Sequence, residues 1–312
     1  MIVVFGSLNV DMLMTVEALP RPAETVLCPD YVLVPGGKGA NQACAAARAA
    51  RADGPPVAMV GTVGPDDWGP LATHLLVEAG VDIANVKRGA KPTACASIWV
   101  ERSGENAIVV ASGANVETRA ADVPEGLLGP ETWLVTQMEV PVEETFSLIG
   151  RAHALGARTI LNVAPARPVP AATLDELDVL VVNEIEARMV AEAEGLAGAD
   201  DPRETGRLLS ARHGMVCVVT LGSDGAVAFG PDGNWSVGSL DVTPVDTTGA
   251  GDAFVGTLAA ALNAGSDLPE ALRYASVGAG LACLTVGCQS AYAKADVIAA
   301  RLEEVAHARP IG

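Results

Sequence analysis

Short runs of apolar residues alternate along most of the chain with longer segments of helical periodicity. The short runs are rich in Val and Ile and lack polar alternation, which is typical of parallel strands covered on both faces. The predicted strands are residues 2–5, 57–60, 133–136, 159–163, 179–182 and 216–220. The predicted helices between them are residues 40–51, 69–79, 142–155, 184–193 and 202–213. This alternation predicts an α/β domain built on a mainly parallel sheet.

The pattern changes in the last third of the chain. Two short apolar runs flank the turn sequence Pro231-Asp232-Gly233 and predict a hairpin over residues 226–229 and 235–237. Long helical patterns follow at residues 250–264, 268–283 and 295–307. We therefore expect a helical layer made largely by the C-terminal part of the chain.

Two segments do not fit the alternation. Residues 10–36 contain four prolines, and two strand-like runs, 94–100 and 107–110, surround Ser103-Gly104-Glu105. Such excursions predict a small β element that projects from the sheet and could close over a site at the carboxyl ends of the strands. The predicted division is a core of residues 1–9, 37–90 and 112–312 and a lid of residues 10–36 and 91–111.

Charge narrows the class of partner. Asp and Glu number 38 against 20 Lys and Arg, so the formal charge is -18. A surface this acidic repels nucleic acids and anionic membranes, and no basic run is long enough to override it. Residues 274–293 carry no charge, but their glycines, Ser276, Gln289 and Ser290 favour a buried helix running into a loop over a membrane span. The expected partner is a small molecule.

Cysteine and histidine usage points to a reducing compartment without a zinc site. The six cysteines form no C-x-x-C pair and lie mostly in apolar runs, as reduced thiols of a cytoplasmic protein do. The four histidines show no spacing typical of metal ligands. The first residues, Met-Ile-Val-Val-Phe-Gly, lack the basic region and the long apolar core of a signal peptide. We expect a cytoplasmic location.

The most informative motif is Asp-Thr-Thr-Gly-Ala-Gly-Asp at residues 246–252, followed at once by an uncharged, alanine-rich helical stretch. It puts the backbone amides of Gly249, Ala250 and Gly251 at a helix N-terminus, which favours a bound anion. A carboxylate at this position repels a bound phosphate and so weakens its binding. Its presence therefore suggests a chemical role. Asp252 is suited to take a proton from a hydroxyl that attacks the phosphate. The motif predicts a phosphoryl-transfer enzyme.

A second glycine-rich segment, residues 36–42, opens a predicted helix but is not a known nucleotide loop. Lys38 is followed by glycine, so the segment is no Walker loop, and no G-x-G-x-x-G follows the first strand. Alone, a flexible turn with a solvated lysine would explain it equally well. Asn9 and Asp11 alternate after the first strand, however, and with Lys38 and Asn41 they offer the paired donors and acceptors that a polyhydroxylated ligand needs.

Two further loops follow predicted strands. Asn183-Glu184-Ile185-Glu186 begins a helix, and an N-cap Asn with acidic residues in the first turn would explain it without any ligand. A functional alternative adds magnesium or phosphate contacts from Asn183 and Glu186. Residues 220–225, Thr-Leu-Gly-Ser-Asp-Gly, are either an ordinary turn or a loop that lines a nucleotide.

Together these segments resemble the PfkB-type sugar kinase family, in order, over nearly the whole chain. The ending D-T-x-x-A-G-D is specific to that family, and G-G-K-G-A-N-Q narrows the resemblance to its ribose-phosphorylating members. The segments that carry it are residues 6–11, 22–25, 36–42, 137–139, 162–167, 183–186, 220–225 and 246–252.

The resemblance implies a three-layer α/β/α fold with a β-sheet lid that often pairs with a second subunit as a homodimer. It implies ATP-dependent phosphorylation of D-ribose at its 5-hydroxyl, with Asp252 as the base and the amides of residues 249–251 as an anion hole. The residues that would hold the sugar are Asn9, Asp11, Gly37, Lys38, Asn41, Glu139 and Asp252. Those that would line the ATP site are Asn183, Thr220, Gly222, Gly225, Gly251 and Ser276.

The resemblance also implies two metal ions. Glu186 would act on Mg²⁺ through water, and a monovalent cation, usually K⁺, would activate the enzyme. Two positions depart from the pattern of the family. Ser276 stands where relatives offer Asn or His near adenine. The loop 287–291 lacks the usual proline and ends in Ala, which removes a hydroxyl that would contact the monovalent cation. The positions that match the monovalent-cation site are Asp246, Thr248, Ala282, Thr285, Gly287 and Ala291.

Two other functions stay open on the sequence. One is a different kinase of the same family, acting on fructose, a ketodeoxy sugar acid or a nucleoside. The other is a sugar-sensing protein on the same fold that does not catalyse. A dehydrogenase would fit the sheet but has no dinucleotide fingerprint here.

Overall fold

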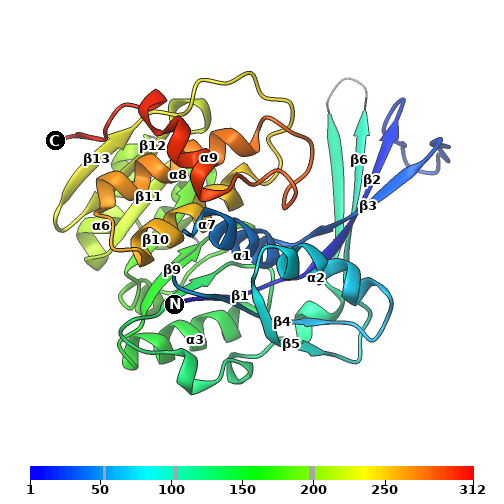
Figure 1. Cartoon of the computed structure of the whole chain (residues 1–312), viewed down its shortest axis with the longest axis horizontal. Helices are drawn as coiled ribbons and strands as arrows, with labels where there is room; N and C mark the ends of the chain where they lie inside the picture. Colours follow the sequence, from blue (N-terminus) through cyan, green and yellow to red (C-terminus); the bar gives the residue numbers. More distant parts are fainter. Residues whose placement is uncertain (52–53, 102–104, 197–200) are drawn as a thin grey trace.

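A computed structural model, which describes residues 1–51, 54–101, 105–196 and 201–312, contains two β-sheets (Figure 1). The larger sheet has ten strands, and its strands from β11 to β5 run parallel. Three antiparallel strands extend it on the β11 side. In spatial order its strands are β14 (Arg309–Pro310), β13 (Gly233–Val237), β12 (Ala226–Gly230), β11 (Val216–Thr220), β10 (Val179–Asn183), β9 (Arg158–Asn162), β8 (Trp133–Thr136), β1 (Ile2–Phe5), β4 (Val57–Val63) and β5 (Asp82–Arg88).

Helices cover both faces of this sheet, because alternate residues of its apolar strands point to opposite sides. Ile2 and Val4 pack in one core with helices α1, α7 and α8, whereas Val3 and Phe5 pack in another with α3. The first layer contains α1 (Lys38–Ala49), α2 (Trp68–Glu78), α7 (Ala250–Asn263), α8 (Leu268–Ala282) and α9 (Ala295–Arg301). The second contains α3 (Val142–Ala154), α4 (Ala171–Leu174), α5 (Glu184–Ala193) and α6 (Pro202–His213). The three-layer α/β/α fold is confirmed.

The smaller sheet has four strands and projects from the core in Figure 1. Its order is β3 (Tyr31–Gly36), β2 (Asn9–Val16), β6 (Ala94–Glu101) and β7 (Asn106–Ala111). Strand β2 pairs antiparallel with β3 and parallel with β6, and β6 forms a hairpin with β7. The predicted turn at Ser103-Gly104 lies outside the described residues. The four strands fall in the segments predicted to form a lid, with β2 starting at Asn9; their action as a lid stays a prediction.

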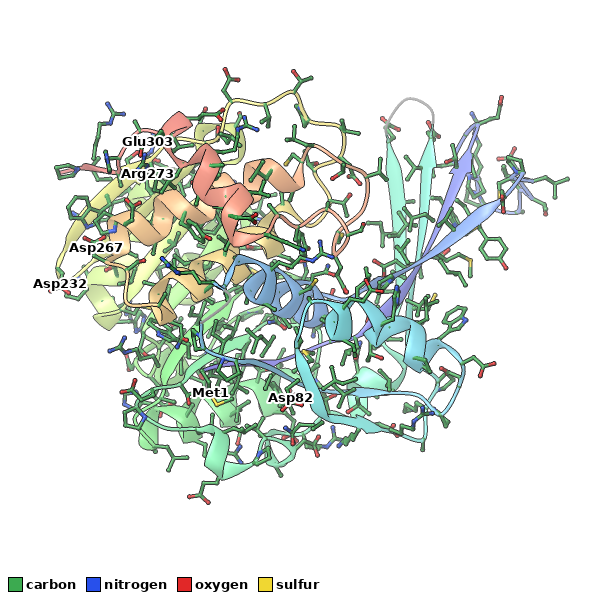
Figure 2. The ribbon with its side chains drawn as sticks, viewed as in Figure 1. Met1, Asp82, Asp232, Asp267, Arg273 and Glu303 are labelled. Carbon is green, nitrogen blue, oxygen red and sulfur yellow. The ribbon has the colours of Figure 1, made fainter. Side chains whose placement is uncertain are left out.

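Most predicted elements agree with the structure to within three residues, but one helix differs more. The helix predicted for residues 295–307 ends at Arg301 and continues as a short 3-10 turn, Leu302–Glu304. Arg273, only 2% exposed, explains the early end, because its guanidinium donates to the carbonyl oxygens of Leu302 and Val305. Figure 2 shows Arg273 beside Glu303, its ion-pair partner at 3.3 Å.

Strand β5 was not predicted. Its sequence, DIANVKR, is half-exposed and polar, so it gives no apolar run. The uncharged segment 274–293 continues α8 to Ala282 and then leaves the helix. Over the part of the chain that the structure describes, no helix combines the length and apolarity needed to cross a membrane. The remaining short 3-10 helices are Gly113–Glu117, Ala120–Asp122, Glu125–Leu127 and Gly222–Asp224.

Candidate active site

The D-T-T-G-A-G-D segment leads into the N-terminus of α7, as predicted. Gly249 is the N-cap, with a left-handed φ of 77°, and Gly251 is exposed in the first turn. A Cβ at residue 249 would come within 2.8 Å of both Cys288 Sγ and Tyr292 Oη, so this position needs glycine for space as well as for conformation. The three predicted anion-hole amides are not equivalent, since the amide of Ala250 donates to the Thr247 carbonyl oxygen at 3.2 Å.

Asp252 lies in the first turn of α7 and is 6% exposed. Its Oδ2 accepts a hydrogen bond from Asn41 Nδ2 at 3.0 Å, and its Oδ1 accepts one from Gln42 Nε2 at 2.9 Å. Both donors are in α1, which packs against α7. The structure therefore brings together Asn41 and Asp252, two predicted site residues more than 200 positions apart. Gln42 was missed as a functional residue, although the sequence displays it in G-G-K-G-A-N-Q.

Asn9 and Asp11 lie near the start of β2 with buried side chains. Asn9 Oδ1 accepts a hydrogen bond from Asn115 Nδ2 at 2.8 Å. Asp11 Oδ1 is buried and has no partner among the described groups. Burial raises the pKa of Asp11 to about 7, and the nearby carboxylates of Glu139 and Asp252 add to the effect. An unpaired buried carboxylate at the edge of a site is suited to bind a ligand hydroxyl.

Glu139 and Lys38 connect this region to the start of α1. Glu139 Oε2 accepts hydrogen bonds from Ser7 Oγ at 2.5 Å and from the Lys38 amide at 2.9 Å. Attraction to Asp252 raises the pKa of the Lys38 ammonium; burial opposes this, and Glu139 and Glu186 reinforce it. Lys38 thus supplies a cation that is attracted to three carboxylates, those of Asp252, Glu139 and Glu186. Gly37 is buried against the backbone of Ser7 and Asn9, with a φ of 90°.

A cavity of about 560 Å³ lies on the other side of the α7 N-terminus. Its volume is in the range of small-molecule sites. Ala250 and Gly251 line it from α7, and Leu240, Phe254 and Gly280 contribute to an apolar wall. The residues predicted for the ATP site that line this cavity are Thr220, Gly222, Gly225, Gly251 and Ser276.

Asn183, the remaining residue predicted for the ATP site, does not line that cavity. It ends β10 opposite Thr220 of β11 and is exposed. Its side chain caps α5 by accepting from the Glu186 amide at 2.9 Å, while Glu186 Oε2 accepts from the Asn183 amide at 2.8 Å. This reciprocal capping box is the structural alternative considered for the motif. Burial raises the pKa of Glu186, although the Asn183 amide and Lys38 oppose it.

Among the described residues, no cluster of three or more His, Cys, Asp or Glu side chains could hold a metal ion. Mg²⁺ bound to a nucleotide needs only one or two protein carboxylates, because phosphate and water supply the other oxygens. Glu186 fits the role of such a carboxylate, because only one of its two oxygens, Oε2, takes part in the capping box.

The residues predicted to bind a monovalent cation are partly brought together. Asp246 accepts the amide of Thr248 at 2.9 Å and the amide of Gly287 at 3.0 Å, one on each carboxylate oxygen. Burial opposes ionisation of Asp246, but these hydrogen bonds prevail and lower its pKa. Ala282 ends α8, Thr285 is exposed in the turn that follows, and the Ala291 amide donates to Cys288.

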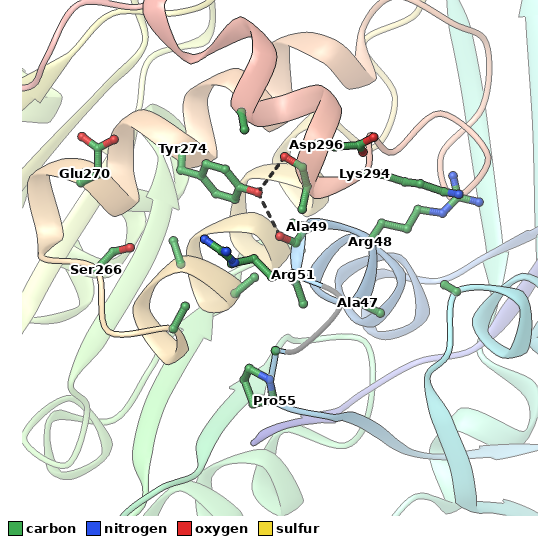
Figure 3. Close-up of a pocket in the computed structure, with 18 of the residues that line it drawn as sticks. Ala47, Arg48, Ala49, Arg51, Pro55, Ser266, Glu270, Tyr274, Lys294 and Asp296 are labelled. Atoms are coloured by element: carbon green, nitrogen blue, oxygen red, sulfur yellow. Dashed lines mark hydrogen bonds between the residues drawn. The ribbon is translucent and has the colours of Figure 1, made fainter.

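A larger cavity of about 990 Å³ lies between α1, α7, α8 and α9 (Figure 3). Three cationic side chains and three carboxylates line it, so its charge is balanced. Tyr274 reaches across it and donates to the Ala49 carbonyl oxygen at 3.0 Å. Its lining includes none of the predicted site residues.

Comparisons with known proteins show the family of the chain. The model of the pfkB family carbohydrate kinases matches residues 1–295. A ribokinase of Schizosaccharomyces pombe is 35% identical over 288 residues, covering 88% of this chain and 89% of the relative.

Two solved structures are similar over nearly the whole fold. Ribokinase from Thermotoga maritima has a TM-score of 0.89 and 27% identity, with 97% of this chain and 99% of that one covered. Arabidopsis thaliana ribokinase complexed with ribose and ATP has a TM-score of 0.84 and 26% identity, with 97% and 98% covered. The chain therefore belongs to the pfkB family of carbohydrate kinases.

Proposed function

We propose that this protein transfers the γ-phosphoryl group of ATP to the 5-hydroxyl of D-ribose, giving ribose 5-phosphate and ADP. One observation carries the proposal. Asp252 lies one residue after Gly251, which lines the 560 Å³ cavity, while its carboxylate contacts Asn41 on the opposite side. A base in this position can contact the acceptor hydroxyl and lie next to the donor phosphate at the same time. The similarity to ribokinases, one of them complexed with ribose and ATP, supports the choice of substrates.

The chemistry requires alignment and charge neutralisation. As the ribose oxygen forms its bond to the γ-phosphorus, the bond to the ADP oxygen breaks and Asp252 takes the hydroxyl proton. The N-terminus of α7 and the Lys38 ammonium stabilise the charge on the phosphoryl oxygens. Asn9, Asp11, Gly37, Lys38, Asn41 and Glu139 hold the sugar. Thr220, Gly222, Gly225, Gly251 and Ser276 line the ATP cavity, and Asn183, opposite Thr220 at the end of β10, would contact the nucleotide from beside it.

Two cations belong to the proposal. Glu186 would hold Mg²⁺ through water, and bound Mg²⁺ would neutralise charge on the nucleotide phosphates. A monovalent cation such as K⁺ would bind beside Asp246, with Thr248 and the loop from Ala282 to Ala291. The hydrogen bonds that join Asp246 to Thr248 and Gly287 support a preformed loop. Turnover in K⁺ compared with a bulky organic cation tests this part alone.

The four-stranded sheet is proposed to close over the sugar and to pair with a second copy of the chain. Apolar side chains exposed on this sheet support an interface there, because such patches mark contact surfaces on soluble proteins. Light scattering of the Val109→Lys variant tests the pairing, and a dimer as stable as the wild type would count against it. The exposed apolar residues are Tyr31, Val32, Ile108, Val109 and Val110.

A coupled assay of ADP production tests the function itself. D-ribose should give the highest kcat/KM in a panel with 2-deoxy-D-ribose, D-fructose, a ketodeoxy sugar acid and nucleosides. A higher value for one of the others would assign a different kinase of the family. Ribose binding without ADP production would assign a sensor. The use of ATP and the six free thiols support a cytoplasmic location.

A further inference from the structure

A chain of buried amide side chains lies behind Asp252 and connects three elements of the core. It runs from the end of β8 through α1 to the end of β9, with a branch to the loop after α8. Each of these side chains is at most 8% exposed. The members are Gln137, Gln42, Asn162, Asn41 and Gln289.

Gln42 is at the centre of this network and is 0% exposed. Its Nε2 donates to Asp252 Oδ1 at 2.9 Å and to Asn162 Oδ1 at 3.0 Å, and its Oε1 accepts from Gln137 Nε2 at 2.7 Å. Asn162 is oriented in turn by donating to the Val181 carbonyl oxygen at 3.1 Å. If the Gln42 amide were turned over, its oxygen would face two acceptor oxygens, so the network permits one orientation.

Asn41 holds the other carboxylate oxygen and has fewer supporting partners than Gln42. It donates to Asp252 Oδ2 at 3.0 Å and accepts from Gln289 Nε2 at 3.1 Å. Gln289 Oε1 is buried without a partner among the described groups, so this branch ends without a further hydrogen bond. Asn41 also belongs to the side proposed for the sugar. Its hydrogen bond to Asp252 can therefore be exchanged for one to a ligand, whereas the bond from Gln42 cannot.

We infer that Gln42 is a positioning residue for the phosphoryl transfer: it holds Asp252 Oδ1, so that Oδ2 alone is presented to the sugar hydroxyl. This inference rests on the proposed function. A neutral amide suits this positioning role, because it fixes the carboxylate without a positive charge that would make Asp252 a weaker base. A misplaced base loses the alignment on which the step depends, and displacements of about 1 Å can cost about 100-fold in rate.

Kinetics of two matched variants test the inference. Gln42→Met keeps the side-chain length but removes the donor, and should lower kcat at least about 10-fold while both KM values stay within about 3-fold. Gln289→Met removes the donor to Asn41 in the same way. It should raise the KM for ribose with a smaller effect on kcat, because Asn41 contacts the sugar and Gln42 does not.

A double-mutant cycle separates positioning from a general structural defect. In an Asp252→Asn background, Gln42→Met should lower kcat by less than about 2-fold, since there is no base left to orient. Gln42→Glu gives a second readout that needs no loss of the polar network. The introduced carboxyl group can donate to Asp252 when it is protonated and repels Asp252 when it is ionised, so kcat relative to the wild type should rise as the pH falls.

The outcomes distinguish this inference from the proposed function. If the wild type phosphorylates ribose and Asp252→Asn is impaired while Gln42→Met has a normal kcat, the positioning role is wrong and the function stands. An equal loss from Gln42→Met with and without Asp252 would also overturn the inference. If the wild type phosphorylates no sugar, the function fails first. Should Gln42→Met not fold, Gln42→Glu carries the test, and a kcat relative to the wild type that does not change with pH would refute the inference.

Discussion

The carboxylate of Asp11 is predicted to destabilise the free protein, and its replacement should reveal this. The side chain is buried, one of its oxygens is unpaired among the described groups, and its pKa is raised from 3.8 to about 7. Between these values the folded protein binds more protons than the unfolded chain, so stability is lost as the pH rises from about 4 to 7. Asp11→Asn removes the buried charge and should remove this loss.

The size of the effect follows from the shift. A difference of about 3 pKa units at about 1.4 kcal/mol each gives an upper value of about 4 kcal/mol. We therefore expect the Asn variant to gain as much as about 4 kcal/mol in free energy of unfolding at pH 8 and less than about 1 kcal/mol at pH 4. Its KM for ribose should rise, because a carboxylate that is proposed to bind a sugar hydroxyl is lost.

Urea unfolding of the ligand-free protein at both pH values measures the effect. Asp232→Asn is the matched control, since its side chain is exposed in the turn between β12 and β13. A gain that does not depend on pH would have another cause than ionisation. An Asp11→Asn variant no more stable than the wild type at pH 8 would refute the reasoning.

Four further predictions concern the site and the proposed lid. Asp252→Asn should lower kcat about 100-fold or more while calorimetry finds ribose and ATP binding largely kept, and near-normal turnover would exclude Asp252 as the base. Gly249→Ala should slow turnover and lower the Tm, because a Cβ at a φ of 77° meets Cys288 and Tyr292; an unchanged kcat would contradict this. Gly225→Ala, at a φ of 86° with the Val237 carbonyl oxygen against the new Cβ, should lower the Tm and raise the KM for ATP. Without sugar, ATP hydrolysis should be slow compared with ribose phosphorylation, and a fast rate would argue against a closing lid.

The buried part of the fold was readable from the sequence because its signals are local. Val216–Thr220 is an unbroken apolar run, and the structure has a strand over the same residues. Strand β5 was missed because it lies half-exposed at the sheet edge, where polar residues cost little. The predicted end of α9 was wrong because the distant Arg273 donates to the carbonyl oxygen of Leu302, which a longer helix would use.

The residues of the candidate site also differ in whether the local sequence could reveal them. The glycines and Asp252 could be found from their spacing before a helix. Gln42 could not be assigned, because its importance comes from partners at residues 137, 162 and 252, which only the fold brings together. The raised pKa of Asp11 likewise depends on Glu139 and Asp252, which are far away in sequence.

The course of strand β2 bears on how the affinity of the protein for a sugar can be changed. The same eight residues carry Asn9 and Asp11 at one end and extend through the projecting sheet at the other. Its neighbour β3 runs directly into Gly37 and the start of α1. A change in the tilt of the four-stranded sheet would therefore be expected to move Asn9 and Asp11, which are proposed to bind the sugar. Evolution or protein engineering could thus adjust how tightly a sugar is held by changing residues that never touch it.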